Sequence, residues 1–218
     1  FAATRRAQIT ETAATSPVLP GDCGATTGAG ADAEGQSTTH LTVADRNGMV
    51  VSYTFTIEST GGNGIVVPGW GFLLNNELTD FDYGSLTAAN RVEGGKRPRS
   101  SMAPTIITRH GKPFLAVGSP GGSMIITTVS QILLERLELG KSLPEAIAAP
   151  RVSQRNTATS VAEPGFPELA ALAARGHTFS EQGEIGAATG IEFLPGGKLL
   201  AAAEPTRRGG GSAMVVKK

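Results

Sequence analysis

The 218-residue chain has a single cysteine, Cys23, and no long apolar run. One cysteine cannot form a disulfide within the chain, and it does not indicate whether the protein works in an oxidising or a reducing compartment. No stretch approaches the ~18 apolar residues of a membrane-spanning helix. Neither sign of charge is in excess, because Lys plus Arg and Asp plus Glu number 19 each. The sequence therefore gives no electrostatic argument for binding nucleic acid or an anionic membrane.

Motifs for metals and nucleotides are missing as well. The three histidines, His40, His110 and His177, do not have the spacing of metal ligands, so we expect them to be structural or solvated. The pair Gly121-Gly122 is not followed by the Lys-Ser/Thr of a P-loop. We expect neither a metal nor a cofactor.

The composition, with 39% apolar and 17% charged residues, is typical of a globular protein with one substantial core or two small ones. Residues 1–15 suit a short helix. Residues 16–37 are rich in Gly, Ala, Pro and acidic residues, which predicts a flexible linker. Because the chain begins at Phe1 and no signal peptide follows, we expect a fragment or a processed piece of a longer protein.

Alternating apolar and polar residues around turn sequences predict three hairpins. The first surrounds Asn47-Gly48, a pair that favours the positive φ angles of a tight turn. The others centre on His110-Gly111 and Pro195-Gly196-Gly197. Apolar residues at helical spacing predict helices at 126–139, after Ser142, and between 167 and 176, and a last strand is expected at 212–216. Strands followed by helices and again by strands indicate an α+β domain.

The stretch "GQSTTHLTVAD", residues 35–45, joins a loose segment to a strand that begins with two threonines. One reading is a strand edge that happens to start with Thr-Thr, since Thr is common in strands. The other is that the chain is cut before Thr38. A threonine hydroxyl is a poor nucleophile without a base, and an N-terminal threonine has its own α-amine, with a pKa near ~8, beside the hydroxyl.

Three further stretches carry polar groups in places that suit chemistry. "GFLLNNELTDF" places Glu77 and Asp80 after an apolar run, where unpaired polar groups are costly. "KRPRSSMAPT" has adjacent hydroxyls in a proline-bounded turn, and "VGSPGGSMIITT" has two glycines between a strand and a helix. Backbone N–H groups at a helix N-terminus bind anions and oxyanions. Taken singly, each stretch is also consistent with ordinary turn chemistry and solvated loops.

Together and in this order, these stretches resemble the small subunit of the gamma-glutamyltranspeptidase family from Gln36 onward. The resemblance implies an N-terminal-nucleophile hydrolase with a four-layer αββα sandwich, of which this chain supplies the small-subunit half. Residues 1–15 and 16–37 resemble the end of the large subunit and its processing linker, and residues 38–218 the small-subunit catalytic domain. It also implies self-cleavage between Ser37 and Thr38, with Thr38 as the nucleophile and the Thr56 hydroxyl bonded to it.

The same resemblance assigns the substrate site. It implies that Glu77 and Asp80 hold the α-ammonium of a γ-glutamyl group, and that Ser100 and Ser101 hold its α-carboxylate. The amides of Gly121 and Gly122 match an oxyanion hole. Glu58 departs from the family, which often has Asn there, and its carboxylate still suits an ammonium.

The activity implied is transfer of a γ-glutamyl group from glutathione or a related amide to water or an amino acceptor. The partner implied is the large subunit of the same precursor, which supplies an arginine for the substrate carboxylate, so we expect the fragment alone to be inactive. The family suggests a periplasmic or extracellular location. A cephalosporin-acylase-like amidase of the same family and a truncated non-catalytic fragment are the alternatives.

Overall fold

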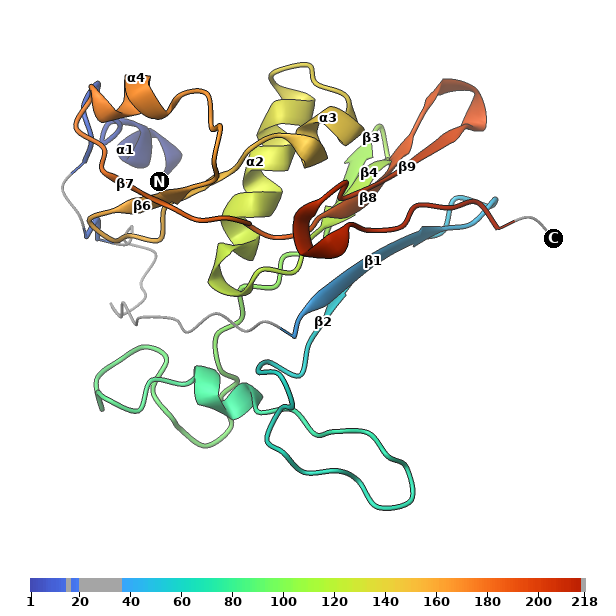
Figure 1. The fold of residues 1–218 in the computed structure, drawn as a ribbon, viewed down its shortest axis with the longest axis horizontal. Coiled ribbons are helices and arrows are strands. Elements are labelled where there is room, and N and C mark those ends of the chain that lie inside the picture. Colours follow the sequence, from blue (N-terminus) through green and yellow to red (C-terminus); the bar gives the residue numbers. More distant parts are fainter. Residues whose placement is uncertain (15–16, 20–36, 217–218) are drawn as a thin grey trace.

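A four-stranded antiparallel sheet forms the centre of the protein (Figure 1). The computed structural model describes residues 1–14, 17–19 and 37–216. Two of the predicted hairpins are confirmed, because the first two strands of the sheet are joined around His110-Gly111 and the last two around 195–197. The strands follow the order β3 (Thr105–Arg109), β4 (Lys112–Gly118), β8 (Thr189–Phe193) and β9 (Leu199–Ala203).

Two consecutive helices, α2 (Ile125–Leu137) and α3 (Leu143–Ala148), cover one face of this sheet. The predicted capping box of α3 is confirmed: the Ser142 hydroxyl accepts from the Glu145 amide, and the Glu145 carboxylate accepts from the Ser142 amide. Burial of apolar side chains between sheet and helices is the main stabilising term. The core consists of Leu115, Val117, Ile125, Val129, Ile132, Leu143, Ala146, Ile147, Ala188 and Ala202.

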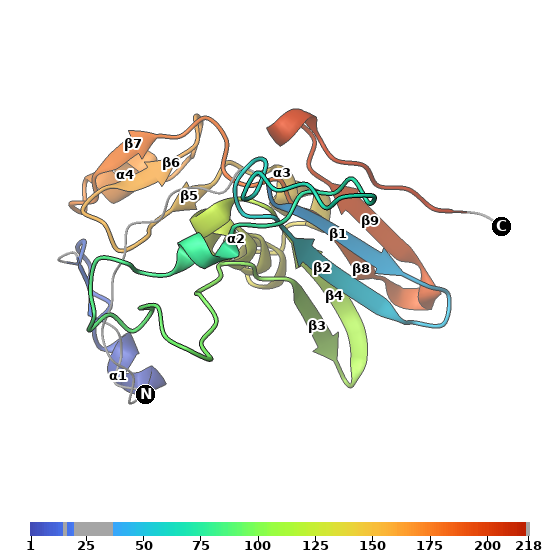
Figure 2. The same ribbon diagram turned by 90° about the horizontal axis from the view of Figure 1, so that it is seen from below.

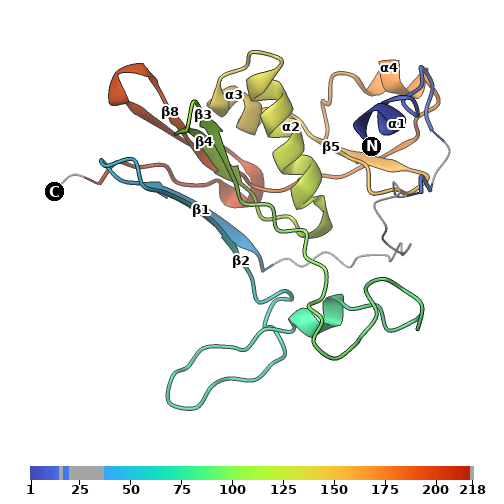
Figure 3. The ribbon, with the colours of Figure 1, turned by 180° about the vertical axis from the view of Figure 1, so that it is seen from behind.

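The third predicted hairpin, β1 (Thr39–Ala44) and β2 (Val50–Phe55), lies on the opposite face of the sheet, against β4 and β8 (Figure 3). Its register is antiparallel, with Thr39 opposite Phe55 and Ala44 opposite Val50. The described residues thus form a helix layer, a four-stranded sheet and a two-stranded sheet. These are three layers of the predicted four-layer sandwich.

The apolar side of the β1–β2 hairpin faces away from the rest of the chain. Its inner side carries polar residues, including His40 and Thr54, which are 7% and 6% exposed. Its outer side carries Val43, Tyr53 and Phe55, which are 56%, 52% and 41% exposed. Tyr53 and Phe55 stack on each other with ring centroids 5.0 Å apart. A contiguous apolar face of this kind marks a surface built for contact.

A smaller lobe lies beside the main sheet (Figure 2). Its three-stranded sheet pairs a β5–β6 hairpin with a parallel strand. The sequence does not predict this sheet, because its strands have only two or three residues each and one pairing joins distant segments. Its elements are β5 (Val152–Ser153), β6 (Ser160–Ala162), α4 (Leu169–Ala173) and β7 (Phe179–Glu181). The short helix α1 (Ala2–Arg6) lies apart from this sheet in Figure 2. Short 3₁₀ turns elsewhere are η1 (Glu77–Asp80), η2 (Gly122–Met124), η3 (Pro195–Gly197) and η4 (Arg207–Gly209).

Three sequence predictions need correction or fall outside the description. The helix predicted over 1–15 is confined to Ala2–Arg6, because its apolar residue Ile9 is 80% exposed and so adds little packing energy to a longer helix. No strand forms at 212–216, which runs exposed beyond the last sheet strand. Most of the predicted linker, residues 20–36, lies outside the described residues. No helix in the described part combines the length and apolar character that a membrane crossing requires.

Candidate active site

Thr38 lies immediately before β1, and its side chain turns inward toward the loop that follows β2. It is 8% exposed, and its hydroxyl donates to the hydroxyl oxygen of Thr56 at 3.1 Å. The same Thr56 oxygen accepts from the Glu58 amide at 2.8 Å. The hairpin register brings these side chains together, because it places Thr39 opposite Phe55, one residue inside each threonine.

Glu58 forms the bend that follows Thr56. Its φ of 70° lies in the left-handed region, which costs a non-glycine residue on the order of 1–3 kcal/mol and is often found at functional sites. Its carbonyl accepts from the hydroxyl of Ser37 at 2.6 Å, and so holds the residue before Thr38. Its carboxylate accepts from Ser59 and from the Asn76 amide group. Glu58 therefore connects the bond before Thr38 to the segment that carries the other acidic residues.

Glu77 and Asp80 lie on the single turn η1, directly after Asn76. Burial raises the pKa of the Glu77 carboxyl, and the nearby negative charges of Asp80 and Glu58 raise it further. One carboxylate oxygen of Glu77 is buried without a hydrogen-bond partner among the described residues. A cation bound here would reduce the repulsion between the Glu77, Asp80 and Glu58 carboxylates, and it would give the buried Glu77 oxygen a partner.

Ser100 and Ser101 follow Arg99 in the extended segment before β3. The Ser100 hydroxyl accepts from the Met102 amide at 3.3 Å, a contact that fixes the turn. Arg99 forms an ion pair with Asp82 at 3.8 Å. The two hydroxyls therefore reach the pocket beside a cation, an arrangement suited to a carboxylate.

Gly121 and Gly122 connect β4 to α2 through the turn η2. Both have positive φ, 143° and 55°, which favours glycine. A Cβ at Gly121 would also lie 3.2 Å from the Cα of Gly186, a tight contact that would require the neighbouring loop to shift. The glycines thus let the backbone approach both a neighbouring loop and the pocket.

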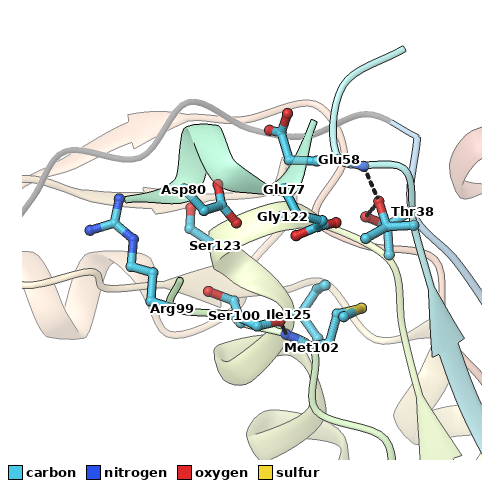
Figure 4. Close-up of a pocket in the computed structure, with 12 residues that line it drawn as sticks. Thr38, Glu58, Glu77, Asp80, Arg99, Ser100, Met102, Gly122, Ser123 and Ile125 are labelled. Carbon is cyan, nitrogen blue, oxygen red and sulfur yellow. Dashed lines mark hydrogen bonds between the residues drawn. The ribbon is translucent and has the colours of Figure 1, made fainter. Parts of the chain in front are cut away.

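Figure 4 shows how these segments converge on one pocket, with Thr38 at one end, Asp80 and Arg99 at the other, and Glu77 between them. Gly121 and Ser37 were predicted as site residues, but neither lines the pocket; each is adjacent in sequence to one that does. The predicted residues that line it are Thr38, Thr56, Glu58, Glu77, Asp80, Ser100, Ser101 and Gly122.

Four lining residues were missed by sequence reasoning: Arg99, Met102, Ser123 and Ile125. Each adjoins or lies close to a predicted residue in sequence, and this closeness was the only signal available. Among the described residues, no group of three or more histidine, aspartate or glutamate side chains is arranged to hold a metal ion.

His40 lies on the inner side of β1, between the two sheets. Its Nδ1 is 2.7 Å from the Thr54 hydroxyl and its Nε2 is 3.1 Å from that of Thr42. Burial lowers the pKa of the imidazole to about 4, so the ring is neutral at pH 7. A Cβ at Gly118 would lie 2.2 Å from this ring. The absence of a side chain at Gly118 therefore makes room for the His40 ring.

Comparisons with known proteins agree with this geometry. A sequence profile described as gamma-glutamyltranspeptidase matches residues 1–214. The chain is 51% identical over 148 residues to the glutathione hydrolase proenzyme of Bacillus subtilis strain 168, a match that covers 67% of this chain and 25% of that protein. The chain thus spans about a quarter of the length of this relative.

Solved structures match as well. One is gamma-glutamyltranspeptidase from Pseudomonas nitroreducens complexed with L-DON, with a TM-score of 0.71 and 37% identity over 82% of this chain and 100% of that chain. Another is cephalosporin acylase from Bacillus halodurans, with a TM-score of 0.80 and 26% identity over 100% of this chain and 38% of that chain. The profile, the relatives and the α+β fold of N-terminal-nucleophile hydrolases agree, and the chain belongs to the gamma-glutamyltranspeptidase family.

Proposed function

We propose that the complete protein transfers γ-glutamyl groups, with glutathione or a related γ-glutamyl amide as donor. The observation that carries this proposal is the position of Thr38. Its buried hydroxyl bonds to Thr56 at 3.1 Å, in the same pocket as the acidic pair Glu77 and Asp80. A nucleophile and an ammonium-binding pair in one pocket fit a substrate whose reactive carbonyl is tethered to an amine.

The nucleophile forms when the precursor cleaves itself between Ser37 and Thr38. Cleavage frees the α-amine of Thr38, which takes the proton of the hydroxyl as the hydroxyl attacks the γ-carbonyl carbon. The α-ammonium of Thr38 returns this proton to the nitrogen of the departing amine, and cleavage of the amide C–N bond leaves a γ-glutamyl ester on Thr38. Attack by water or an amino acceptor on this ester returns the free threonine.

The remaining residues bind the substrate around this centre. Glu77 and Asp80 hold the α-ammonium through charge-assisted hydrogen bonds, and Glu58 adds negative charge beside them. Ser100 and Ser101 donate to the α-carboxylate. The amides of Gly121 and Gly122 stabilise the oxyanion, where one such donor is typically worth ~3–4 kcal/mol.

The large subunit of the same precursor is the partner in this proposal. Its helices cover the exposed face of Val43, Tyr53 and Phe55, and it supplies an arginine for the substrate carboxylate. A chain limited to residues 1–218 is therefore inactive by itself.

The kinship with cephalosporin acylase favours a second candidate, hydrolysis of another acyl amide. An acyl group without an amine leaves Glu77 and Asp80 without a partner, which argues for the γ-glutamyl donor.

The test is to express the complete gene product and assay γ-glutamyl-p-nitroanilide beside glutaryl-p-nitroanilide, which lacks the amine. Release of p-nitroaniline only from the γ-glutamyl compound supports the proposal. Release only from the glutaryl compound establishes the acylase, and an inert protein establishes the non-catalytic reading.

A further inference from the structure

Arg208, near the end of the chain, contacts the backbone of the nucleophile. Its Nη1 donates to the carbonyl oxygen of Thr38 at 3.3 Å, across 170 residues of sequence. Strand pairing begins only at Thr39. The Arg208 contact therefore adds a tether at the peptide that joins Thr38 to β1. A residue that loses its preceding peptide bond depends on such tethers for its orientation.

The backbone of Arg208 is itself fixed. Its φ of 52° lies in the left-handed region, and its amide donates to the carboxylate of Glu184 at 2.9 Å. The preceding residue, Arg207, is buried and ion-paired with both Glu163 and Glu204. Because the backbone of Arg208 is already fixed, the contact with Thr38 orders only the side chain and not the turn that carries it.

The scaffold formed by Arg207 and its partners Glu163 and Glu204 also contacts the loop that lies against the glycine turn. Glu163 accepts from the Ile185 amide at 2.6 Å, next to the Glu184 residue that binds Arg208. The following residue, Gly186, lies directly against Gly121. The scaffold thus reaches both the carbonyl of Thr38 and the turn assigned to the oxyanion.

We propose that Arg208 is a positioning residue that holds the Thr38 peptide, so that the hydroxyl stays on Thr56 and faces the glycine turn. This inference rests on the proposed function, in which Thr38 becomes the N-terminal nucleophile. Arg208 acts through Thr38 and does not touch the substrate.

The charge of Arg208 adds a second effect. A nearby cation disfavours the ammonium form of the Thr38 α-amine and so keeps this base neutral at lower pH. The carboxylates of Glu58, Glu77 and Asp80, which line the pocket, act in the opposite direction, and the cation of Arg99 lies at its far end. Arg208 offsets part of this acidic charge at residue 38.

The decisive variants are Arg208→Gly and Arg208→Lys in the complete gene product. Glycine keeps the left-handed backbone and the amide donor to Glu184 but removes the guanidinium. We expect kcat to fall about 10- to 100-fold with KM nearly unchanged, since a lost hydrogen bond to a charged group has this size. The acid limb of the pH profile of kcat/KM should move to higher pH. Lysine should restore the acid limb but only part of kcat.

A remote arginine provides the control. Arg109 is exposed at the far end of β3, beside the β3–β4 turn, and lies over the ring of Phe114. Arg109→Gln should leave kcat and the acid limb unchanged. Melting temperatures of all three variants should match that of the wild type, because Arg208 is also exposed.

A second readout does not depend on γ-glutamyl turnover. Trinitrobenzenesulfonate labels neutral amines, so its rate with the Thr38 α-amine, followed by mass spectrometry of the N-terminal peptide, reports the titration of that amine. A wild-type enzyme inert toward γ-glutamyl donors, with a labelling midpoint that Arg208→Gly still raises, would reject the proposed function and retain the role of Arg208. Loss of cleavage before Thr38 in Arg208→Gly, at an unchanged melting temperature, would also support positioning. Wild-type kcat and an unchanged labelling midpoint in Arg208→Gly would overturn the inference, as would losses in both variants that follow melting temperature alone.

Discussion

The hydroxyls of Thr38 and Thr56 lie 3.1 Å apart where the two strands of the β1–β2 hairpin meet the pocket. We expect the complete precursor to cleave before Thr38, because the Thr38 hydroxyl is buried and hydrogen-bonded to Thr56 beside the Ser37–Thr38 peptide bond. Mass spectrometry of the purified protein should show a new N-terminus at Thr38, and Thr38→Ala should stay intact. Thr38→Ser, which keeps a hydroxyl, should still cleave. Equal cleavage of Thr38→Ala would remove Thr38 from the mechanism.

Substitution of Asp80 should damage substrate binding far more than folding. Asp80→Ala removes one of the two carboxylates that we propose for the substrate ammonium and leaves Glu77 in the pocket. By analogy with buried charge pairs, the loss is on the order of 2–5 kcal/mol. We expect a large rise in KM with a nearly unchanged melting temperature. Steady-state kinetics and thermal unfolding of the same preparation test this. Wild-type kinetics in the variant would place the ammonium elsewhere.

The buried imidazole of His40 should make stability depend on pH. Its pKa is lowered from 6.5 to about 4 in the folded protein, so between these values the unfolded chain binds a proton that the folded chain does not. The free energy of unfolding therefore falls as the pH drops through this window, by about 3 kcal/mol in total. Denaturant titrations at pH 7 and pH 4.5 measure this slope.

Two variants test whether His40 causes this pH dependence of the free energy of unfolding. His40→Gln should reduce it, even if the variant is less stable at every pH. His110→Gln, which changes an exposed histidine, should leave it intact. An equal slope in wild type and His40→Gln would show that other groups cause the pH dependence.

The buried cluster of Arg151, Glu204 and Arg207 should be sensitive to the loss of its shared carboxylate. Glu204 pairs with Arg151 at 2.9 Å and with Arg207 at 2.7 Å, and its side chain is completely buried. We expect Glu204→Gln to lower the free energy of unfolding by about 3–5 kcal/mol, because it leaves buried positive charge uncompensated. The exposed pair of Arg91 and Glu93 is the matched control. Glu93→Gln should change stability by about 1 kcal/mol or less.

The isolated chain should not behave as a well-ordered monomer. The outer face of the β1–β2 hairpin exposes Val43, Val51, Tyr53 and Phe55, a surface that favours association in water. Expression of residues 1–218 alone, followed by sedimentation, apolar-dye binding and donor hydrolysis, tests this. A monodisperse monomer that melts cooperatively and turns over γ-glutamyl donors normally would contradict the half-fold argument.

The parts of the fold that local sequence determines could be predicted well. The three hairpins have turn residues that demand special φ angles, and α3 has both members of its capping box, Ser142 and Glu145. For the short helices α1 and α4, the sequence predicts longer spans than the structure shows. The helix near 167–176 is confined to Leu169–Ala173, because one turn without buried residues cannot offset the cost of extending further.

The geometry of the site could be predicted only in part. The residue types of Thr38, Glu77 and Asp80 suggest their chemistry, but the loops that carry the acidic residues have little regular structure, so no periodicity indicates where they lead. The bend at Glu58 shows the same limit, since nothing in its sequence predicts a φ of 70°. The contact of Arg208 with Thr38 is harder still to predict from the sequence, because it depends on a turn fixed by buried ion pairs from distant segments.

The register of the β1–β2 hairpin has a consequence for insertions and deletions. Side chains alternate between the faces of a strand, so Thr38 and His40 share the inward side only while Ala44 stays opposite Val50. A deletion of one residue in the connecting turn, within 45–49, can be absorbed by a slip of β1 past β2. That slip would turn Thr38 outward and turn the apolar side chain of Leu41 to the inner face, which now carries polar residues. The number of residues in this turn therefore decides whether Thr38 faces the pocket at all.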